Sequence, residues 1–206
     1  MNMKLTNLQG SILGLPLGRK KADIAKTFVP SIRESLPEGV ANKLLTGYEI
    51  DLSTEDDQAF ERVLQFGGDV SFYAGTFAFA QGLEKDMPVY MYRFNEPNGW
   101  PGPWQGRSTH IHDVALLFQN FSEFLSGAQN QLAEEFATDV LSFANKKEPW
   151  QNWTKSRKVA KVIATDGRVM KEDVPEQTGR RKFFVDLANE VGLDTLRGAF
   201  DRFMTS

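Results

Sequence analysis

The segment MPVYMYRF, residues 87–94, restricts the fold more than any other feature, because its mix of β-branched and aromatic residues is typical of a β-strand. A proline near its start and the loop NEPNGWPGPWQG after it bound this strand. We therefore predict a buried strand over Val89 to Phe94. Loops of this length are often functional, although Trp100 and Trp104 leave open the alternative that they only pin the loop to the surface.

Helical patterns fill much of the chain on either side of this strand. Before Pro37 we predict two short helices, with Pro30 opening the second of them. An amphipathic helix is predicted from Thr54 to a stop at Gly67-Gly68, and a second, mostly buried helix follows to about Gly82. The large apolar residues of that second helix are Phe72, Phe77 and Phe79.

The second half of the chain predicts a long helix, a hairpin and a helical end. From Asn120 to Asn145, apolar residues recur at steps of three and four, which indicates one long helix. Residues 159–170 are predicted to form a β-hairpin that turns at Asp166-Gly167. Gly192 is predicted to separate the last two helices. One face of the final helix is predicted to carry Leu193, Leu196, Phe200 and Phe203.

Composition limits the classes of function. The chain has 206 residues, 41% of them hydrophobic and 12% aromatic, which is enough for one sizeable core in a globular domain. A net charge of −3 gives no basic field for nucleic acid or anionic lipid, so neither partner is predicted. The absence of cysteine excludes disulfides and thiolate catalysis. We predict no signal peptide and no membrane span, because polar residues interrupt every apolar stretch.

Both histidines of the chain lie in the segment GRSTHIHDVALLF, residues 106–118, where His110, His112 and Asp113 are clustered. Such a cluster suggests a metal site. However, residues from Asp113 to Phe118 have the pattern of a short helix, on which side chains two positions apart diverge. We therefore predict no metal site. Two interpretations remain from the local pattern, namely ordinary half-buried histidines or a histidine that acts in catalysis.

The order of strand, loop, histidine and apolar helix matches the last member of the catalytic triad in α/β-hydrolases. The run from Val89 to Phe118 resembles the C-terminal region of type-B carboxylesterases and lipases, the cholinesterase-like branch, with fungal members the most similar. In that family the strand reads Val-Tyr-x-Tyr-x-Phe, and the catalytic histidine opens a His-x-x-Glu/Asp stretch before an apolar helix. His110 and Asp113 occupy those positions. The resemblance continues through PWQNW, residues 149–153, to TGRRKFFVDLANEVGL, residues 178–193, so it covers most of the chain.

The resemblance implies a fold class, a chemistry and two site residues. It implies an α/β class, helix-rich with a few strands, in which residues 1–206 form the C-terminal portion of an incomplete α/β-hydrolase domain. It implies a small-molecule carboxylic ester as substrate and a reaction without metal or organic cofactor. His110 takes the position of the general base, which accepts the proton of a serine. Gln9, in the run QGSIL, takes the position of the acid, although its neutral amide would not stabilise an imidazolium as a carboxylate does.

The nucleophile motif of this family, G-x-S-x-G, does not occur in the sequence. The nearest match, GRSTH at residues 106–110, fails at its last position, so Ser108 is not a candidate nucleophile. The glycine-rich oxyanion loop is absent too. We therefore expect an esterase-like protein that is inactive alone, or alternatively a non-catalytic cholinesterase-like binding module. An incomplete sheet that leaves Tyr90 and Tyr92 uncovered would also favour self-association.

Overall fold

The computed structural model describes residues 20–102, 105–109, 111–165 and 179–206. These residues form two compact units, each of which is described by itself. The described residues from 80 to 165 form one unit, which we call the α/β unit. Residues 20–79 and 179–206 form the other, which we call the helical unit. Each unit has its own cluster of buried apolar side chains.

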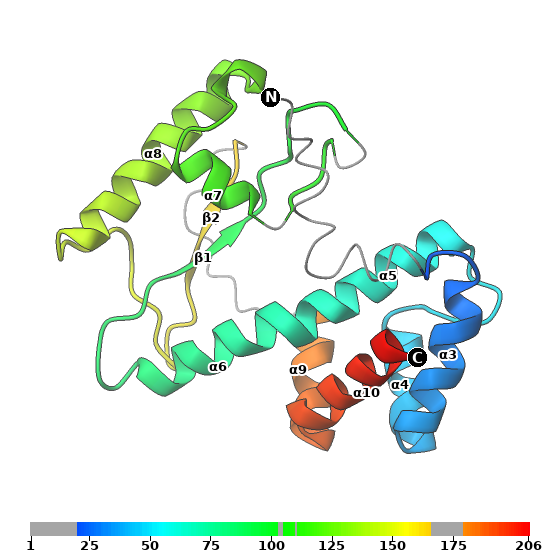
Figure 1. The fold of residues 1–206 in the computed structure, drawn as a ribbon. Helices are drawn as coiled ribbons and strands as arrows, with labels where there is room; N and C mark the ends of the chain where they lie inside the picture. Colours follow the sequence, from blue (N-terminus) through cyan, green and yellow to red (C-terminus); the bar gives the residue numbers. More distant parts are fainter. Residues whose placement is uncertain (1–19, 103–104, 110, 166–178) are drawn as a thin grey trace. The chain divides into compact units, whose positions relative to one another are not determined.

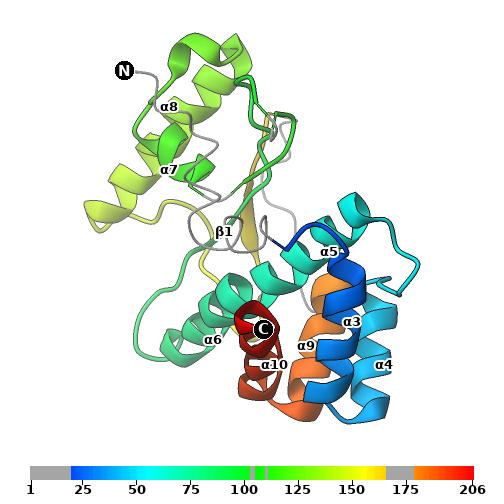
Figure 2. The ribbon, with the colours of Figure 1, turned by 45° about the vertical axis from the view of Figure 1, so that its right-hand side comes forward.

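The helical unit is built from α-helices and one π-helical turn. Its elements are α3 (Ile24–Ser35), α4 (Glu38–Gly47), α5 (Asp56–Gly68), η2 (Asp69–Tyr73), most of α6 (Ala74–Leu83), α9 (Gly179–Val191) and α10 (Leu193–Thr205). Helix α3 packs against α4, α5 and α10, and α9 packs against α4 and α10 (Figures 1 and 2). Phenylalanine rings fill the centre, where Phe28 meets Phe203 edge-on at a centroid distance of 4.9 Å.

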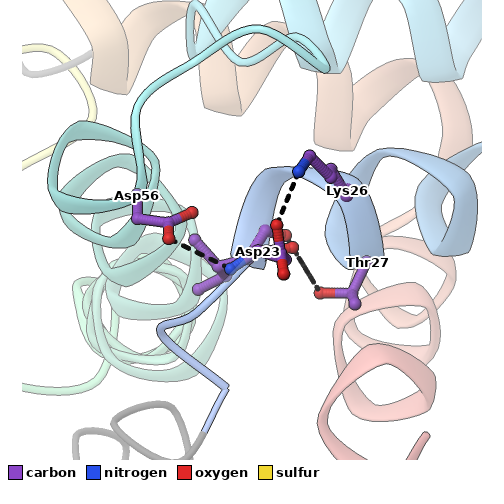
Figure 3. A network of polar contacts seen from close by, with 5 residues as sticks. Asp23, Lys26, Thr27 and Asp56 are labelled. Carbon is purple, nitrogen blue, oxygen red and sulfur yellow. Dashed lines mark hydrogen bonds and ion pairs between the residues drawn. The ribbon is translucent and has the colours of Figure 1, made fainter.

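The helix α3 runs through Pro30 without a break, so the prediction that Pro30 opens a second helix was wrong. A proline inside a helix deprives the carbonyl four residues earlier of its hydrogen bond. Here that carbonyl belongs to Lys26, which is exposed, as is Pro30, so water can satisfy it. The start of α3 is fixed by Asp23, whose backbone N–H donates to Asp56 of α5 at 3.1 Å and whose carboxylate accepts from Lys26 at 2.6 Å (Figure 3).

The helix predicted from Thr54 is confirmed as α5, which ends at Gly68 as predicted, but the two glycines do not interrupt the helical course of the chain. Gly68 has an ordinary helical φ of −64°, and the chain continues through η2 into α6. Gly67 serves packing instead, because a Cβ placed there would lie 2.5 Å from Cζ of Phe200 in α10. The helix predicted to end near Gly82 is confirmed as α6. Its burial was overestimated, since the Phe79 side chain is 70% exposed.

We predict that Gly67→Ala and Gly68→Ala change stability in opposite directions. Alanine at 67 would collide with the buried ring of Phe200, and overpacking of this kind costs about 1–3 kcal/mol. Alanine at 68 meets no atom within 4 Å and should raise the free energy of unfolding by about 0.5–1 kcal/mol. Urea unfolding of the two variants beside the parent chain measures both effects. Equal effects of the two substitutions would contradict the packing role of Gly67.

The helical end of the chain agrees with the prediction. Gly192 separates α9 from α10 with φ at 87°, a conformation that glycine adopts without steric cost. On the predicted face of α10, Leu196, Phe200 and Phe203 are buried in the core of the helical unit, and Leu193 packs against it.

The α/β unit contains two parallel strands joined by a helical crossover. Strand β1 (Met91–Phe94) pairs with β2 (Ala160–Ile163), and the register places Tyr92 opposite Lys161. Between them lie α7 (His112–Leu117), η3 (Ser122–Phe124) and α8 (Gly127–Ala144). Helices α7 and α8 pack against each other (Figures 1 and 2). The ring of Tyr92 meets Phe136 of α8 at a centroid distance of 5.3 Å, so α8 covers this face of the strands.

The strand predicted over Val89 to Phe94 is confirmed, but it is shorter and less buried than expected. Its hydrogen-bonded pairing with β2 begins at Met91, and Val89 instead makes an isolated antiparallel bridge with Trp153. The strand predicted from residue 159 is confirmed as β2. Among the described residues it pairs in parallel with β1. The predicted turn at Asp166-Gly167 and the strand beyond it lie outside the described residues.

The long helix predicted from Asn120 is confirmed as α8, which begins later, at Gly127. Ser126 caps it, because its hydroxyl accepts from the Gln129 backbone N–H at 3.2 Å while the Gln129 side chain accepts from the Ser126 N–H at 3.1 Å. The described part of the chain is thus helix-rich with few strands, as predicted. No helix within those described ranges has the length and apolar character needed to cross a bilayer.

Candidate functional site

The two residues predicted to act in catalysis, His110 and Gln9, lie outside the described residues. The structure does describe the segments on both sides of position 110, namely residues 105–109 and the chain from Ile111 onward. The candidate site is therefore built from the side chains and backbone that bracket this position.

The loop after β1 is held to the two strands at its ends, to β2 at its start and to β1 at its end. At its start, the Asn95 backbone N–H donates to the carbonyl of Ile163 in β2 at 2.9 Å. At its end, the Ser108 hydroxyl donates to the carbonyl of Phe94 at 2.7 Å. Between them, the Asn98 carbonyl accepts from the Gly106 backbone N–H at 2.8 Å. Ser108 therefore serves the backbone of β1, which agrees with its exclusion as a nucleophile.

The chain turns sharply between the loop and α7. The His112 backbone N–H donates to the Thr109 carbonyl at 3.2 Å, which ties the start of α7 to the end of the loop. Ile111, within this turn, has a positive φ of 69°. A left-handed conformation costs a residue other than glycine about 1–2 kcal/mol, and more is expected for a β-branched one. The surrounding contacts must therefore hold this turn in place.

One of those contacts joins two residues of the motif directly. The Tyr92 hydroxyl of β1 donates to Asp113 Oδ2, the second residue of α7, at 2.8 Å. Burial, and then the bond to Asp113, raise the pKa of Tyr92, so its hydroxyl stays protonated and remains a donor. The Val-Tyr-x-Tyr-x-Phe and His-x-x-Asp patterns are thus linked by a hydrogen bond that fixes α7 relative to β1.

His112 supplies a second contact between α7 and β1. Its ring lies edge-on to Phe94 at a centroid distance of 5.0 Å and to Trp100 at 4.8 Å. The side chain is 2% exposed, and neither ring nitrogen has a hydrogen-bond partner among the described residues. Burial lowers the pKa of His112, and the nearby charge of Glu96 opposes this shift without reversing it. The ring is therefore an uncharged, packed side chain near neutral pH.

Glu96 is a buried carboxylate at the start of the same loop, with a side chain that is 1% exposed. It accepts from the Gln129 side chain of α8 at 2.8 Å and from the Thr165 backbone N–H, just after β2, at 2.6 Å. Gln129 also donates to the Pro97 carbonyl at 3.0 Å. Glu96 therefore ties the loop to the start of α8 and to the end of β2.

The roles of Glu96 and Tyr92 were not predicted from the sequence. A signal for Glu96 was present, because it is the only acidic residue between Asp86 and Asp113 and it follows a strand closely. Its partner Thr165 lies 69 residues away, however, and local patterns do not reveal such pairings. Among residues with described positions, no three histidine, aspartate or glutamate side chains gather to hold a metal ion.

The chain was compared with known proteins in three ways. A family model described as Carboxylesterase family matches residues 17–185, which include β1, the loop, α7, α8 and β2. Neither the curated proteins nor the solved structures gave a match. The match covers most of the chain, and it includes the segment in which the catalytic histidine is predicted.

Proposed function

This chain belongs to the carboxylesterase family, and on that premise we propose that its segment 89–118 supplies the histidine of a serine esterase site, with His110 as the general base. The match over residues 17–185 is the observation that carries this proposal. In such a site the imidazole accepts the proton of a serine hydroxyl and then returns it to the leaving alcohol. The substrate class is a carboxylic ester of a small molecule, the substrate class of both carboxylesterases and lipases.

The described surroundings of position 110 support a role that needs a fixed side chain. A general base must be held within hydrogen-bonding reach of its proton donor, and small displacements reduce the rate strongly. Ser108 fastens the chain before position 110 to β1, and the Tyr92–Asp113 bond fastens the chain after it. The described residues on both sides of position 110 are therefore anchored to the same strand.

We further propose that residues 1–206 correspond to the C-terminal portion of an α/β-hydrolase domain. The parallel pairing of β1 with β2 through a helical crossover supports this, since parallel pairs joined by helices are typical of α/β sheets. The printed sequence contains no G-x-S-x-G motif, and it has Gln9 at the acid position. An amide there would stabilise an imidazolium less than a carboxylate, so this chain is proposed to be inactive alone.

The purified chain is expected to hydrolyse p-nitrophenyl butyrate no faster than free imidazole does. The nucleophile and the oxyanion donors supply most of the acceleration in this chemistry, and each oxyanion donor alone is worth about 10²–10³ in rate. A fluorophosphonate probe should likewise leave the chain unlabelled. Adding a carboxylesterase segment with the nucleophile should restore turnover that His110→Ala then abolishes. Turnover that survives His110→Ala would contradict the role of His110.

A second candidate function is a non-catalytic binding module, and exposed apolar residues on and just after α7 favour it. Val114 and Phe118, four positions apart, are 42% and 68% exposed. Contiguous exposed apolar surface commonly marks an interaction site. Sedimentation with dye binding separates the candidates. Self-association with strong dye binding favours the uncovered sheet of an incomplete domain, whereas a monomer with one cooperative transition favours the binding module.

A further inference from the structure

His112 is a buried polar side chain that the proposed ester chemistry does not use. It is 2% exposed, and neither ring nitrogen has a hydrogen-bond partner among the described residues. Each unpaired buried polar group costs about 1–3 kcal/mol. Leucine would fill a similar space without that cost, so a histidine at this position needs a physical reason.

The ring of His112 joins three parts of the α/β unit. It belongs to the first residue of α7, it contacts Phe94 of β1, and it contacts Trp100 of the loop. The backbone N–H of the same residue closes the turn to Thr109. The side chain thus packs against β1 at the point where the backbone is held in the strained conformation of Ile111. Loss of this packing would free the turn from its aromatic support.

A charge on the ring would oppose this packing. Burial lowers the pKa of His112, whereas the charge and backbone of Glu96 in the loop, and the charge of Asp113 in α7, act in the opposite direction. Asp113 is already bonded to the protonated hydroxyl of Tyr92. Helix α8, which packs on α7, contributes the apolar Ala133 to the neighbouring cluster. The pocket therefore accommodates the neutral ring. Neither ring nitrogen makes a hydrogen bond with a described side chain, and the influences that favour a proton on the ring, the charges of Glu96 and Asp113 and the backbone of Glu96, do not outweigh burial.

We propose that His112 is a positioning residue, whose neutral ring holds the start of α7 against β1 and the loop, and whose protonation loosens that packing. The start of α7 then loses its aromatic support when the pH falls. The consequence for catalysis rests on the proposed role of His110. The structural statement about His112 does not, because it concerns only the packing of the ring and its protonation.

The sign of the pH effect follows from the two states of the chain. When the pH falls through about 6.5, the unfolded chain takes up a proton at His112. The folded chain resists this proton, because burial lowers the pKa. The folded-to-unfolded ratio should therefore fall below that pH, by up to about tenfold per pH unit, until the lower folded pKa is reached. Above pH 7 both states are neutral at this side chain, and the contribution is constant.

Proton NMR of the whole chain tests the proposal, since the chain has only two histidines. The imidazole resonances are assigned with His110→Leu and His112→Leu. In the folded parent chain, the His112 resonance should keep its neutral position from pH 7 down to well below 6.5. Its titration should then coincide with changes in the Phe94 and Trp100 ring resonances. A His112 resonance that titrates near 6.5 in the folded chain would overturn the proposal.

Thermal unfolding of the two leucine variants gives an independent readout. His112→Leu should be at least as stable as the parent chain at pH 7, and it should lose the decrease in stability between pH 7 and 5. His110→Leu is the matched control and should retain that decrease. In His112→Leu, the His110 resonance at pH 5 should keep the dispersion that it has at pH 7. An unfolded His112→Leu at pH 7 would overturn the proposal, because it would mean that the ring nitrogens make essential bonds.

Hydrolysis is not needed for either readout, so the two proposals fail separately. If ester hydrolysis never appears with a complementing segment, the role of His110 is wrong while the titration of His112 can still hold. If His112 titrates as an exposed histidine, its positioning role is wrong while the esterase proposal stands.

Discussion

Arg180→Met should lower the free energy of unfolding of the chain by about 2–4 kcal/mol, because it breaks the ion pair of a buried carboxylate. Asp69, the first residue of η2, is 3% exposed and pairs with Arg180 of α9. It also accepts from the Tyr48 hydroxyl at 2.8 Å. Arg180 in turn donates to the Gln65 carbonyl at 3.1 Å. The substitution leaves the buried Asp69 carboxylate with the Tyr48 hydroxyl as a donor and with the weaker influence of the Arg181 charge.

The pH dependence of this variant separates a charge effect from lost packing. Burial raises the pKa of Asp69, and the positive charge of Arg180 is the largest influence that opposes this shift. Without Arg180 the pKa of Asp69 rises further, so its proton is bound more tightly in the folded chain than in the unfolded one. Stability should therefore recover as the pH falls from 7 toward 4. Urea unfolding at several pH values measures this recovery.

An exposed arginine on a neighbouring helix provides the control. Arg197 of α10 pairs with Asp201, but both side chains are about two-thirds exposed, at 68% and 64%. Arg197→Met should change the free energy of unfolding by less than about 0.5 kcal/mol, since exposed ion pairs contribute little. Equal losses for Arg180→Met and Arg197→Met would show that the burial of Asp69 does not matter.

Helix positions could be predicted from the sequence because they depend on local spacing. The apolar steps of three and four predicted α5, α8 and α10, and in α5 and α10 the spaced apolar residues face the core of the helical unit. The errors came from helix-breaking residues, whose effect depends on the side chains around them and not on the local sequence alone. Pro30 lies on an exposed face where its missing bond is harmless, and Gly67 lies under the ring of Phe200 near the end of α5, where the chain continues helically into η2.

Strand pairing could not be predicted in the same way. The residues of β1 and β2 indicated strands, but their parallel pairing depends on a crossover of more than sixty residues that no local pattern encodes. The Asp166-Gly167 pair suggested a hairpin because such pairs favour tight turns. That pair lies outside the described residues, so the hairpin stays a prediction. Among the residues that the structure describes, β2 pairs with β1.

The same distinction between local patterns and long-range contacts applies to the candidate site. The short helix expected from Asp113 is confirmed as α7, because its apolar spacing is local. The assignments of His110 and Gln9 stay predictions, since both lie outside the described residues. Tyr92, Glu96 and their partners emerged only from the structure. The two hydrogen bonds that anchor α7 and the loop connect residues 21 and 69 positions apart.

Glu96→Ala should lower the free energy of unfolding by about 2–4 kcal/mol, because it removes a buried acceptor and leaves its donors unpaired. The Thr165 backbone N–H and the Gln129 side chain would each lose this bond, and the side chain of Glu96 is 1% exposed, so water cannot readily replace it. Urea unfolding of the variant beside the parent chain measures the loss.

The control for this prediction is Glu123→Ala, which removes an exposed glutamate of η3 and should change stability by less than about 0.5 kcal/mol. Glu96→Gln should fall between the two, because it keeps the shape and one acceptor oxygen but turns an N–H₂ group toward a donor. It also removes the charge that holds up the pKa of His112, so the His112 resonance should stay neutral to a still lower pH than in the parent chain. A Glu96→Ala variant as stable as Glu123→Ala would mean that Glu96 does not hold the loop after β1, and the anchoring of the loop end and of α7 to β1 would then rest on Ser108, Tyr92 and Asp113.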